Sequence, residues 1–391
     1  MATVNLPLPT SRRRFMRQVG QVGQVSVGML LTLSTGHSLA KLNNMPYWAG
    51  TAKQGRFYWL IIFDLQGQVI RQIKLPSRGH GLQQSTKGQL VVCSRRPGVW
   101  MLMLQHALAP TQWLQVTLNS PLSGHCCFSS NGELLYSAEN NIALGEGCIG
   151  VWDGHTGKRL HQWLSQGIGP HEIQLSHDGK SLWVANGGIL TQPKSGRKQL
   201  NLATMAANIS YLCLDNGALK KQYSIDEPKL SLRHIAVNSS NQVAVACQYQ
   251  GPSYDRKNVL LLISGGHMNY LPCDAKVMMN INNYLGSVAF DISGRWLSAS
   301  SPRGNLVVVW QLVQGFKSIH YHTLSITDAC GLSANDERGG FIISTGMGHL
   351  YHYEATTKQL KPMDLDTRST KPFSWDNHLM LRPLYQGTCV T

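Results

Sequence analysis

Seven segments spread along the chain start alike, and this repeat constrains the fold more than any other feature of the sequence. In the clearest copy, residues 167–188, a histidine (His171) heads a short alternating strand, a turn at Asp178-Gly179 follows, and a second strand ends in Asn-Gly-Gly. Apolar residues that alternate on both sides of a short glycine-containing turn are typical of a β-hairpin. The seven copies begin at His80, His125, His171, His234, Ser287, Cys330 and His378.

The spacing of these copies predicts a β-propeller. Successive starts lie 43 to 63 residues apart, and a period of about 40–50 residues with four strands in each repeat is the signature of a propeller blade. Third and fourth strands are expected at 148–152 and 159–164 in the second repeat, and a third strand at 306–310 in the fifth. The longest interval contains an insertion at 187–207, which we expect to form a surface loop.

The two ends of the chain predict how the ring closes. The repeat at His378 offers only an inner strand, whereas residues 47–75 offer outer strands without an inner one. Joined in one sheet, they complete a seventh blade and leave no exposed sheet edge at the seam. We therefore predict an all-β, seven-bladed propeller that forms a single domain over residues 45–385.

The first forty residues have the pattern of a twin-arginine export signal. Residues 10–17, TSRRRFMR, carry the paired arginines, residues 25–33 supply a moderately apolar run, and Ser38-Leu39-Ala40 offers small residues for cleavage. The apolar run is too short to span a membrane comfortably. We predict a signal peptide over residues 1–40 and a periplasmic protein, attached to the membrane only if the signal stays uncleaved.

Charge and cysteine content narrow the classes of function. The net charge is +15, four arginines of the first forty residues account for part of it, and the remaining chain carries +11. Its lysines and arginines are dispersed, so we expect no nucleic-acid partner and a monomer with a basic surface. The nine cysteines include no CxxC pair, which argues against a zinc knuckle, a thioredoxin-like motif and covalent haem.

The direction of the strands is expected to gather the repeat starts on one face. In each blade the inner strand starts on this face and the second strand returns to it. The candidate metal ligands are His80, His125, His171, Glu172, His234, Cys330 and His378, with Ser287 completing the ring. The candidate ligand-binding residues around them are Arg95, Arg96, Glu139, Asn140, Asn186, Arg233, Gln248, Tyr249 and Arg303.

Three hypotheses for this face stay open. Imidazole, carboxylate and thiol groups suit iron, copper or zinc, so the ring can bind a metal or, through its arginines, an anionic ligand. A bound metal would also permit hydrolase or oxidoreductase chemistry, although we favour binding over catalysis. In the third hypothesis the protein is an interaction scaffold with structural histidines, because Gly124-His125 and Trp152-Asp153 fit the hydrogen-bond network of WD-type blades.

Several motifs resemble one bacterial family. GPHEIQLSHDGKSLWVANGGI, RHIAV with CQYQGP, NYLGSVAF followed by SPRGN, and WDNHL are similar to the domain-of-unknown-function family fifteen-thirteen. The resemblance implies a periplasmic seven-bladed propeller of the YVTN and quinoprotein-like kind, often encoded near imelysin-type iron-uptake proteins and di-haem oxidase-like proteins. It therefore implies an accessory role in iron or redox homeostasis, with periplasmic iron-uptake or redox proteins as partners.

Overall fold

The computed structural model describes residues 45–196, 198–313, 319–366 and 372–382. They belong to one compact unit, Asn43–Thr391. The signal peptide predicted for residues 1–40 and the ninth cysteine, Cys389, lie outside the described residues. None of the described helices is long and apolar enough to cross a membrane.

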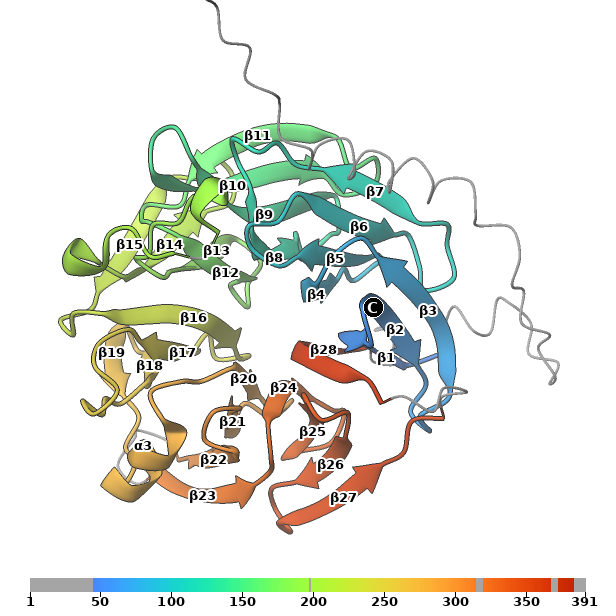
Figure 1. Cartoon of the computed structure of the whole chain (residues 1–391), viewed down its shortest axis with the longest axis vertical. Coiled ribbons are helices and arrows are strands. Elements are labelled where there is room, and N and C mark those ends of the chain that lie inside the picture. The colour runs from blue at the N-terminus through green and yellow to red at the C-terminus, as the bar shows by residue number, and fades with distance from the viewer. Residues whose placement is uncertain (1–44, 197, 314–318, 367–371, 383–391) are drawn as a thin grey trace, which may run out of the picture. The chain divides into compact units, whose positions relative to one another are not determined.

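Antiparallel four-stranded blades arranged in a ring make up this unit (Figure 1). From inner to outer strand, the first blade consists of β4 (Gly79–Gln84), β5 (Leu90–Ser94), β6 (Trp100–Leu104) and β7 (Gln112–Gln115). The second consists of β8 (Leu122–Phe128), β9 (Leu134–Asn141), β10 (Glu146–Asp153) and β11 (Arg159–Leu164). The third consists of β12 (Pro170–Leu175), β13 (Ser181–Asn186), β14 (Asn208–Cys213) and β15 (Leu219–Ser224).

The remaining blades follow the same order. The fourth consists of β16 (Leu230–Val237), β17 (Val243–Tyr249), β18 (Leu260–Ser264) and β19 (His267–Tyr270). The fifth consists of β20 (Ser287–Phe290), β21 (Trp296–Ser301), β22 (Leu306–Leu312) and β23 (Ile319–Ser325). The sixth consists of β24 (Ala329–Ala334), β25 (Gly340–Thr345), β26 (Leu350–Glu354) and β27 (Gln359–Met363).

The seventh blade, here called the closing blade, joins the two ends of the chain as predicted. Its inner strand is β28 (Ser374–Arg382), and its outer strands are β1 (Tyr47–Gln54), β2 (Phe57–Phe63) and β3 (Val69–Leu75). A single parallel bridge between Leu332 and His378 links it to the sixth blade, so that seven blades form six sheets. The predicted all-β, seven-bladed propeller is confirmed.

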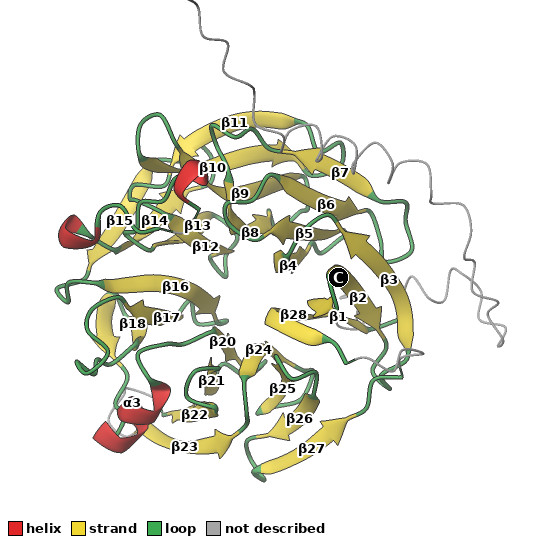
Figure 2. Ribbon diagram, in the orientation of Figure 1, coloured by secondary structure: helices red, strands yellow, loops and turns green. Residues whose placement is uncertain are grey.

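Strands dominate this unit because short alternating runs are separated by turns (Figure 2). The predicted insertion at 187–207 is a loop with two short 3-10 helices, Pro193–Ser195 and Leu202–Thr204. A seven-residue helix, α3 (Ala275–Ile281), between the fourth and fifth blades was not predicted. The core lies between the blades, where large side chains such as Trp48, Trp100 and Trp310 are almost fully buried.

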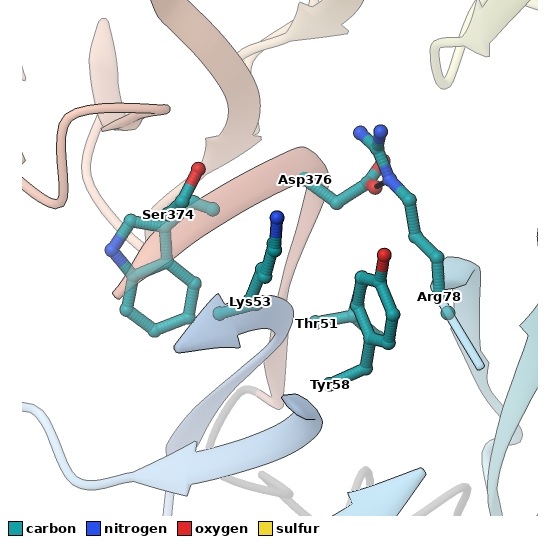
Figure 3. Close-up of a pocket in the computed structure, with 9 residues that line it drawn as sticks. Thr51, Lys53, Tyr58, Arg78, Ser374 and Asp376 are labelled. Atoms are coloured by element: carbon teal, nitrogen blue, oxygen red, sulfur yellow. Dashed lines mark hydrogen bonds and ion pairs between the residues drawn. The ribbon is translucent and has the colours of Figure 1, made fainter. Parts of the chain in front are cut away.

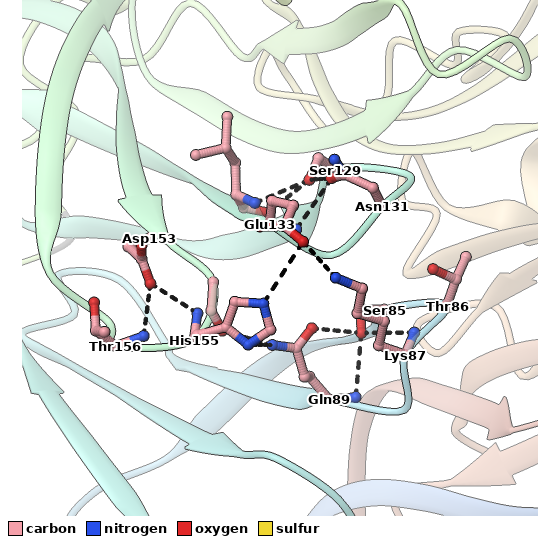
Figure 4. Close-up of polar contacts among 12 residues, drawn as sticks. Ser85, Thr86, Lys87, Gln89, Ser129, Asn131, Glu133, Asp153, His155 and Thr156 are labelled. Carbon is pink, nitrogen blue, oxygen red and sulfur yellow. Dashed lines mark hydrogen bonds and ion pairs between the residues drawn. The ribbon is translucent and has the colours of Figure 1, made fainter.

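Polar turns stitch neighbouring blades together on the face opposite the repeat starts (Figure 4). Lys87 of the first blade forms an ion pair with Glu133 of the second, and Gln89 donates a hydrogen bond to the carbonyl of Gly154 at 2.7 Å. Asp153 accepts hydrogen bonds from the backbone N–H groups of His155 and Thr156 and thereby fixes its own turn.

Candidate functional site

Irregular pairing at the heads of the inner strands turns the repeat starts towards the axis of the ring. The register with the neighbouring strand slips in six blades, and β-bulges of this kind re-aim side chains next to functional sites. The slips lie between Gly79 and Leu82, Leu122 and Cys126, Pro170 and Glu172, Leu232 and His234, Ala329 and Leu332, and opposite Gly50–Ala52 in β28. In the fifth blade Ser287 pairs regularly with Ser300.

Glycine permits the close approach of the first two blades. Gly124 has φ of +116°, and a Cβ atom there would lie 2.8 Å from Cδ2 of His80. A Cβ atom on Gly81 would lie 2.5 Å from the carbonyl oxygen of Gly124 and 2.9 Å from Nδ1 of His125. Any larger residue at either position would push the two imidazoles apart.

Five histidines from five blades meet at the axis. Nine of their ring pairs have centroids 4.6 to 6.0 Å apart. Two buried carboxylates adjoin the rings, and we call the seven residues together the central cluster. Its members are His80, His125, His171, Glu172, His234, Asp376 and His378.

Asp376 holds the first of these imidazoles in a defined orientation. Its Oδ1 lies 2.7 Å from Nδ1 of His80, and its Oδ2 is bonded to Nε of Arg78. Burial acts to raise the pKa of Asp376, but His80, Arg78 and Arg95 outweigh it and hold that pKa well below its usual range. Because an ionised carboxylate can only accept, Nδ1 of His80 carries the proton, and Nε2 keeps a lone pair.

Glu172 supports a second imidazole in the same way. Its Oε2 lies 3.0 Å from Nδ1 of His234 and accepts the backbone N–H of Ile235, while Gln174 donates to Oε1 at 3.0 Å. Nδ1 of His125 is 3.8 Å from Oε1. Burial raises the pKa of Glu172, although His378 and these donors act in the opposite direction. Both oxygens are thus already engaged.

The imidazoles of the central cluster are kept neutral. Burial lowers the pKa of His80 and, more strongly, those of His125, His171, His234 and His378. Mutual proximity lowers them further, and Arg233 adds to the effect at His171 and His234. Neutral imidazole is the form that ligates metals.

Three nitrogens of the central cluster have no hydrogen-bond partner among the described residues. They are Nε2 of His125, Nδ1 of His171 and Nε2 of His378, all three buried. A buried polar atom without a partner costs free energy, so it calls for an explanation such as a ligand. In the part of the chain that the structure describes, three groups have ligand atoms within 4.8 Å of one another: His80–His125–His378, His80–His171–His234 and His125–Glu172–His234.

Cavities open on both sides of the cluster. The smaller, of about 30 Å³, is lined by His80, His171 and His234 together with Arg95, Arg96, Arg233, Gln248, Tyr284 and Asn377. The larger, of about 1100 Å³, is lined on its inner side by Glu172, His234 and His378 and further out by the inner strands of five blades. One side therefore has room for a water-sized ligand beside arginines, and the other admits larger molecules.

The structure brings some predicted site residues together and separates others. Arg95, Arg96, Arg233 and Gln248 line the small cavity with the histidines, and Arg303 lies 4.3 Å over the ring of Tyr284, which lines the same cavity. Ser287 is a wall residue of the large cavity. Cys330 belongs to none of the three groups, and its Sγ faces the carbonyl of Asp328 at 3.2 Å.

Four predicted residues make contacts within their own blades instead. Glu139 accepts a bidentate pair from Arg159 at 2.8 and 2.9 Å, and Asn140 donates to Ser123. Asn186 donates to the carbonyl of Ser165 and to Asn208, and Tyr249 donates to Asp255 at 2.7 Å. These contacts occupy the polar groups that were expected to face the ring.

The WD-type network suggested by the sequence does not form at His125. Nε1 of Trp152 donates to Ser137 at 2.8 Å, and Asp153 binds the backbone of its own turn. His125 contacts Glu172 and the other imidazoles instead. The arrangement thus lacks the hydrogen bonds on which the structural interpretation of this histidine depended.

Sequence reasoning missed Asp376, Arg78, Tyr284 and Asn377. Asp376 is 3% exposed and precedes His378 by two residues in the sequence WDNHL. A carboxylate next to a predicted metal ligand was the available signal, because ligating histidines usually donate their second N–H to such a group.

Comparison with known proteins identifies the family and the fold. The family model described as "Protein of unknown function (DUF1513)" matches residues 73–382, a range that begins within β3. No curated protein matches the sequence. Among solved structures, hydrazine synthase of Kuenenia stuttgartiensis is similar, with a TM-score of 0.55 and 14% sequence identity over 86% of this chain and 100% of that chain. At this identity the likeness concerns the fold alone.

Proposed function

The chain belongs to this DUF1513 family, whose description assigns no function, and we propose that its propeller binds one divalent transition-metal ion in the central cluster. The observation that carries the proposal is the set of buried, neutral imidazoles from different blades whose ligand atoms lie within 4.8 Å, three of them with an unpartnered nitrogen. The group His80–His171–His234 suits the ion best, because it lies beside the small cavity.

The geometry of this group requires only a small contraction on binding. A tetrahedral ion with metal–nitrogen distances of about 2.1 Å places its ligand atoms about 3.4 Å apart. From separations of at most 4.8 Å, each ring would move inward by less than about 1 Å on that geometry. Asp376 and Glu172 would act as outer partners that orient His80 and His234, as is common for ligating histidines.

The donor set narrows the choice of metal. Imidazole nitrogens with nearby carboxylates suit iron(II), copper(II) and zinc, whereas soft copper(I) and iron–sulfur clusters favour thiolates. Cys330, the candidate thiolate, is in none of the three groups found among the described residues. We propose iron as the physiological metal and an accessory role in periplasmic iron or redox homeostasis; the export signal and the family resemblance support this role.

Metal titration of the purified protein tests the proposal. After chelation and buffer exchange, calorimetric titration with Zn²⁺ and, under anaerobic conditions, Fe²⁺ should reveal one saturable site per chain. A stoichiometry near zero, or several weak sites that an unrelated exposed-histidine protein also shows, would contradict it.

Changing Asp376 to asparagine is expected to lower metal affinity about 10- to 100-fold, because loss of an outer-shell partner typically costs that much. The neutral amide no longer holds the proton on Nδ1 of His80. Competition with a chelating dye measures the change. The matched control is Glu139→Gln, which also removes a buried carboxylate from an arginine pair but lies outside the central cluster. It should leave metal affinity unaltered.

Export by the twin-arginine route is part of the proposal. Changing Arg12 and Arg13 together to lysine should keep most of the protein in the cytoplasm, since both arginines belong to the recognised motif. Immunoblots of periplasmic and cytoplasmic fractions measure the outcome. Equal periplasmic recovery of the double variant and the wild type would exclude this route.

A second candidate function places catalysis at the same metal. The small cavity has room for about one water molecule beside His80, His171 and His234, and a bound metal lowers the pKa of its water to generate a nucleophile. Arg95, Arg96 and Arg233 would then stabilise an anionic substrate. Metal-dependent turnover of a lactone or phosphate ester that is lost with His171→Leu would favour the enzyme over the binding protein.

A further inference from the structure

A separate cavity lies at the seam where the closing blade meets the first blade (Figure 3). It has a volume of about 140 Å³ and is built by β1, the start of β2, the start of β28 and the residues that lead into β4. Its lining includes Thr51, Lys53, Tyr58, Arg78, Ser374 and Asp376. Neither the export signal nor the central cluster accounts for it.

The cavity is rich in hydrogen-bond donors without partners. Lys53 and Tyr58 make no hydrogen bond or ion pair with any described residue, and only Nε of Arg78 is engaged, which leaves its two terminal nitrogens available. Thr51 is 2% exposed, and its Oγ1 is buried without a partner among the described residues. Figure 3 shows the amino group of Lys53, the hydroxyl of Tyr58 and the Arg78–Asp376 pair around one space.

The acceptor in this cavity is already saturated. The carboxylate of Asp376 accepts from His80, from Arg78 and from the backbone N–H of Asn377. Lys53 and Arg78 supply two positive charges and Asp376 one negative charge, so the lining carries a net charge of +1. A fitting ligand therefore brings several acceptor oxygens and a negative charge, and a volume of about 140 Å³ limits it to a small molecule.

We propose that this seam cavity binds a small oxyanion of the phosphate or carboxylate class between Lys53 and the terminal nitrogens of Arg78. The ammonium of Lys53 and the guanidinium of Arg78 would form charge-assisted hydrogen bonds to it, and Tyr58 and Thr51 would donate from the sides. The site is independent of any metal: it lies on the Arg78 side of Asp376, whereas the central cluster lies on the His80 side.

Titration of the metal-free, full-length protein with inorganic phosphate, sulfate and succinate tests the inference, with chloride at matched ionic strength as the reference. Saturable binding of at least one of the three is expected, and the strongest of them identifies the ligand class. Lys53→Met should weaken binding about tenfold or more, since one charge-assisted contact is lost. Lys276→Met removes an exposed lysine of α3 and the same charge, and it should leave the affinity unchanged.

A third variant separates the seam cavity from the central cluster. Arg96→Gln alters the small cavity beside the histidines and should not affect phosphate binding. If Arg96→Gln abolishes binding and Lys53→Met does not, the anion binds at the central cluster and the inference is wrong. Equal weakening by Lys53→Met and Lys276→Met, or no saturable binding of any of the three anions, would overturn it too. Because Lys53 is exposed, failure to fold is not expected, and circular dichroism of each variant checks this.

Discussion

Changing His171 to leucine is expected to abolish tight metal binding and to leave the metal-free protein as stable as the wild type, or more stable. Nδ1 of His171 is buried without a hydrogen-bond partner among the described residues. Burying a polar atom in this way costs roughly 1–3 kcal/mol, and an apolar side chain of similar size removes that cost. Since loss of an outer-shell partner alone costs 10- to 100-fold in affinity, loss of a ligand should cost more than about 100-fold.

Two control variants sharpen this test. His234→Leu removes the partner of Glu172, so it should lower both metal affinity and the free energy of unfolding, the latter by roughly 1–3 kcal/mol for the carboxyl group left unpaired. His267→Leu changes an exposed histidine of β19 and should alter neither quantity. Urea denaturation and dye competition measure both. A His171→Leu protein that loses several kcal/mol and keeps its metal affinity would mean that the histidines are structural.

Mild acid is expected to destabilise the metal-free propeller strongly. The pKa values of His80, His125, His171, His234 and His378 are lowered in the folded protein, chiefly by burial. In the unfolded chain each histidine takes up a proton as the pH falls below about 6.5, while in the folded protein it stays neutral. The unfolded state then binds more protons, so the free energy of unfolding falls as the pH falls.

The expected loss between pH 7.5 and 5.5 is on the order of 5 kcal/mol, at about 1 kcal/mol for each histidine. The raised pKa of Glu172 acts in the opposite direction, because the folded protein takes up that proton at a higher pH than the unfolded chain. Asp376, whose pKa is lowered, adds a further loss only below about pH 4.

Urea denaturation at a series of pH values measures this dependence. The His171→Leu variant should have a shallower slope, by about one proton, and saturating metal should shift the acid transition to lower pH, since metal and protons compete for the same nitrogens. Stability that is constant or rises between pH 7.5 and 5.5 would contradict a cluster of neutral histidines.

The architecture could be predicted from the sequence because each blade repeats the same local pattern. Glycine turns between alternating strands fix the hairpins, and the spacing of the histidine-headed starts fixes the number of blades. Complementary pieces at residues 47–75 and at His378 predicted the closing blade, which the pairing of β1 with β28 confirms. The helix α3 carried no such signal, since its seven residues lack an acidic first turn and a side-chain cap.

The central cluster could be predicted only in part, because β-bulges leave no clear mark in a sequence. Cys330 and His80 occupy equivalent bulges, yet Cys330 stays out of the cluster, and nothing in the residue pattern distinguishes them. Glu139 was expected at the ring because it ends a second strand; its pairing with Arg159 depends on the neighbouring strands β10 and β11. Asp376 reaches His80 from the other end of the chain, a contact that depends on ring closure.

Anomalous diffraction from crystals of the metal-loaded protein tests the central proposal most directly. Data collected on both sides of the absorption edge of the bound metal locate the ion without reference to any variant. The account predicts one strong peak at about 2.0–2.2 Å from nitrogens of His80, His171 and His234. A peak confined to exposed histidines such as His161 or His267, or no peak at the central cluster at saturating metal, would contradict it.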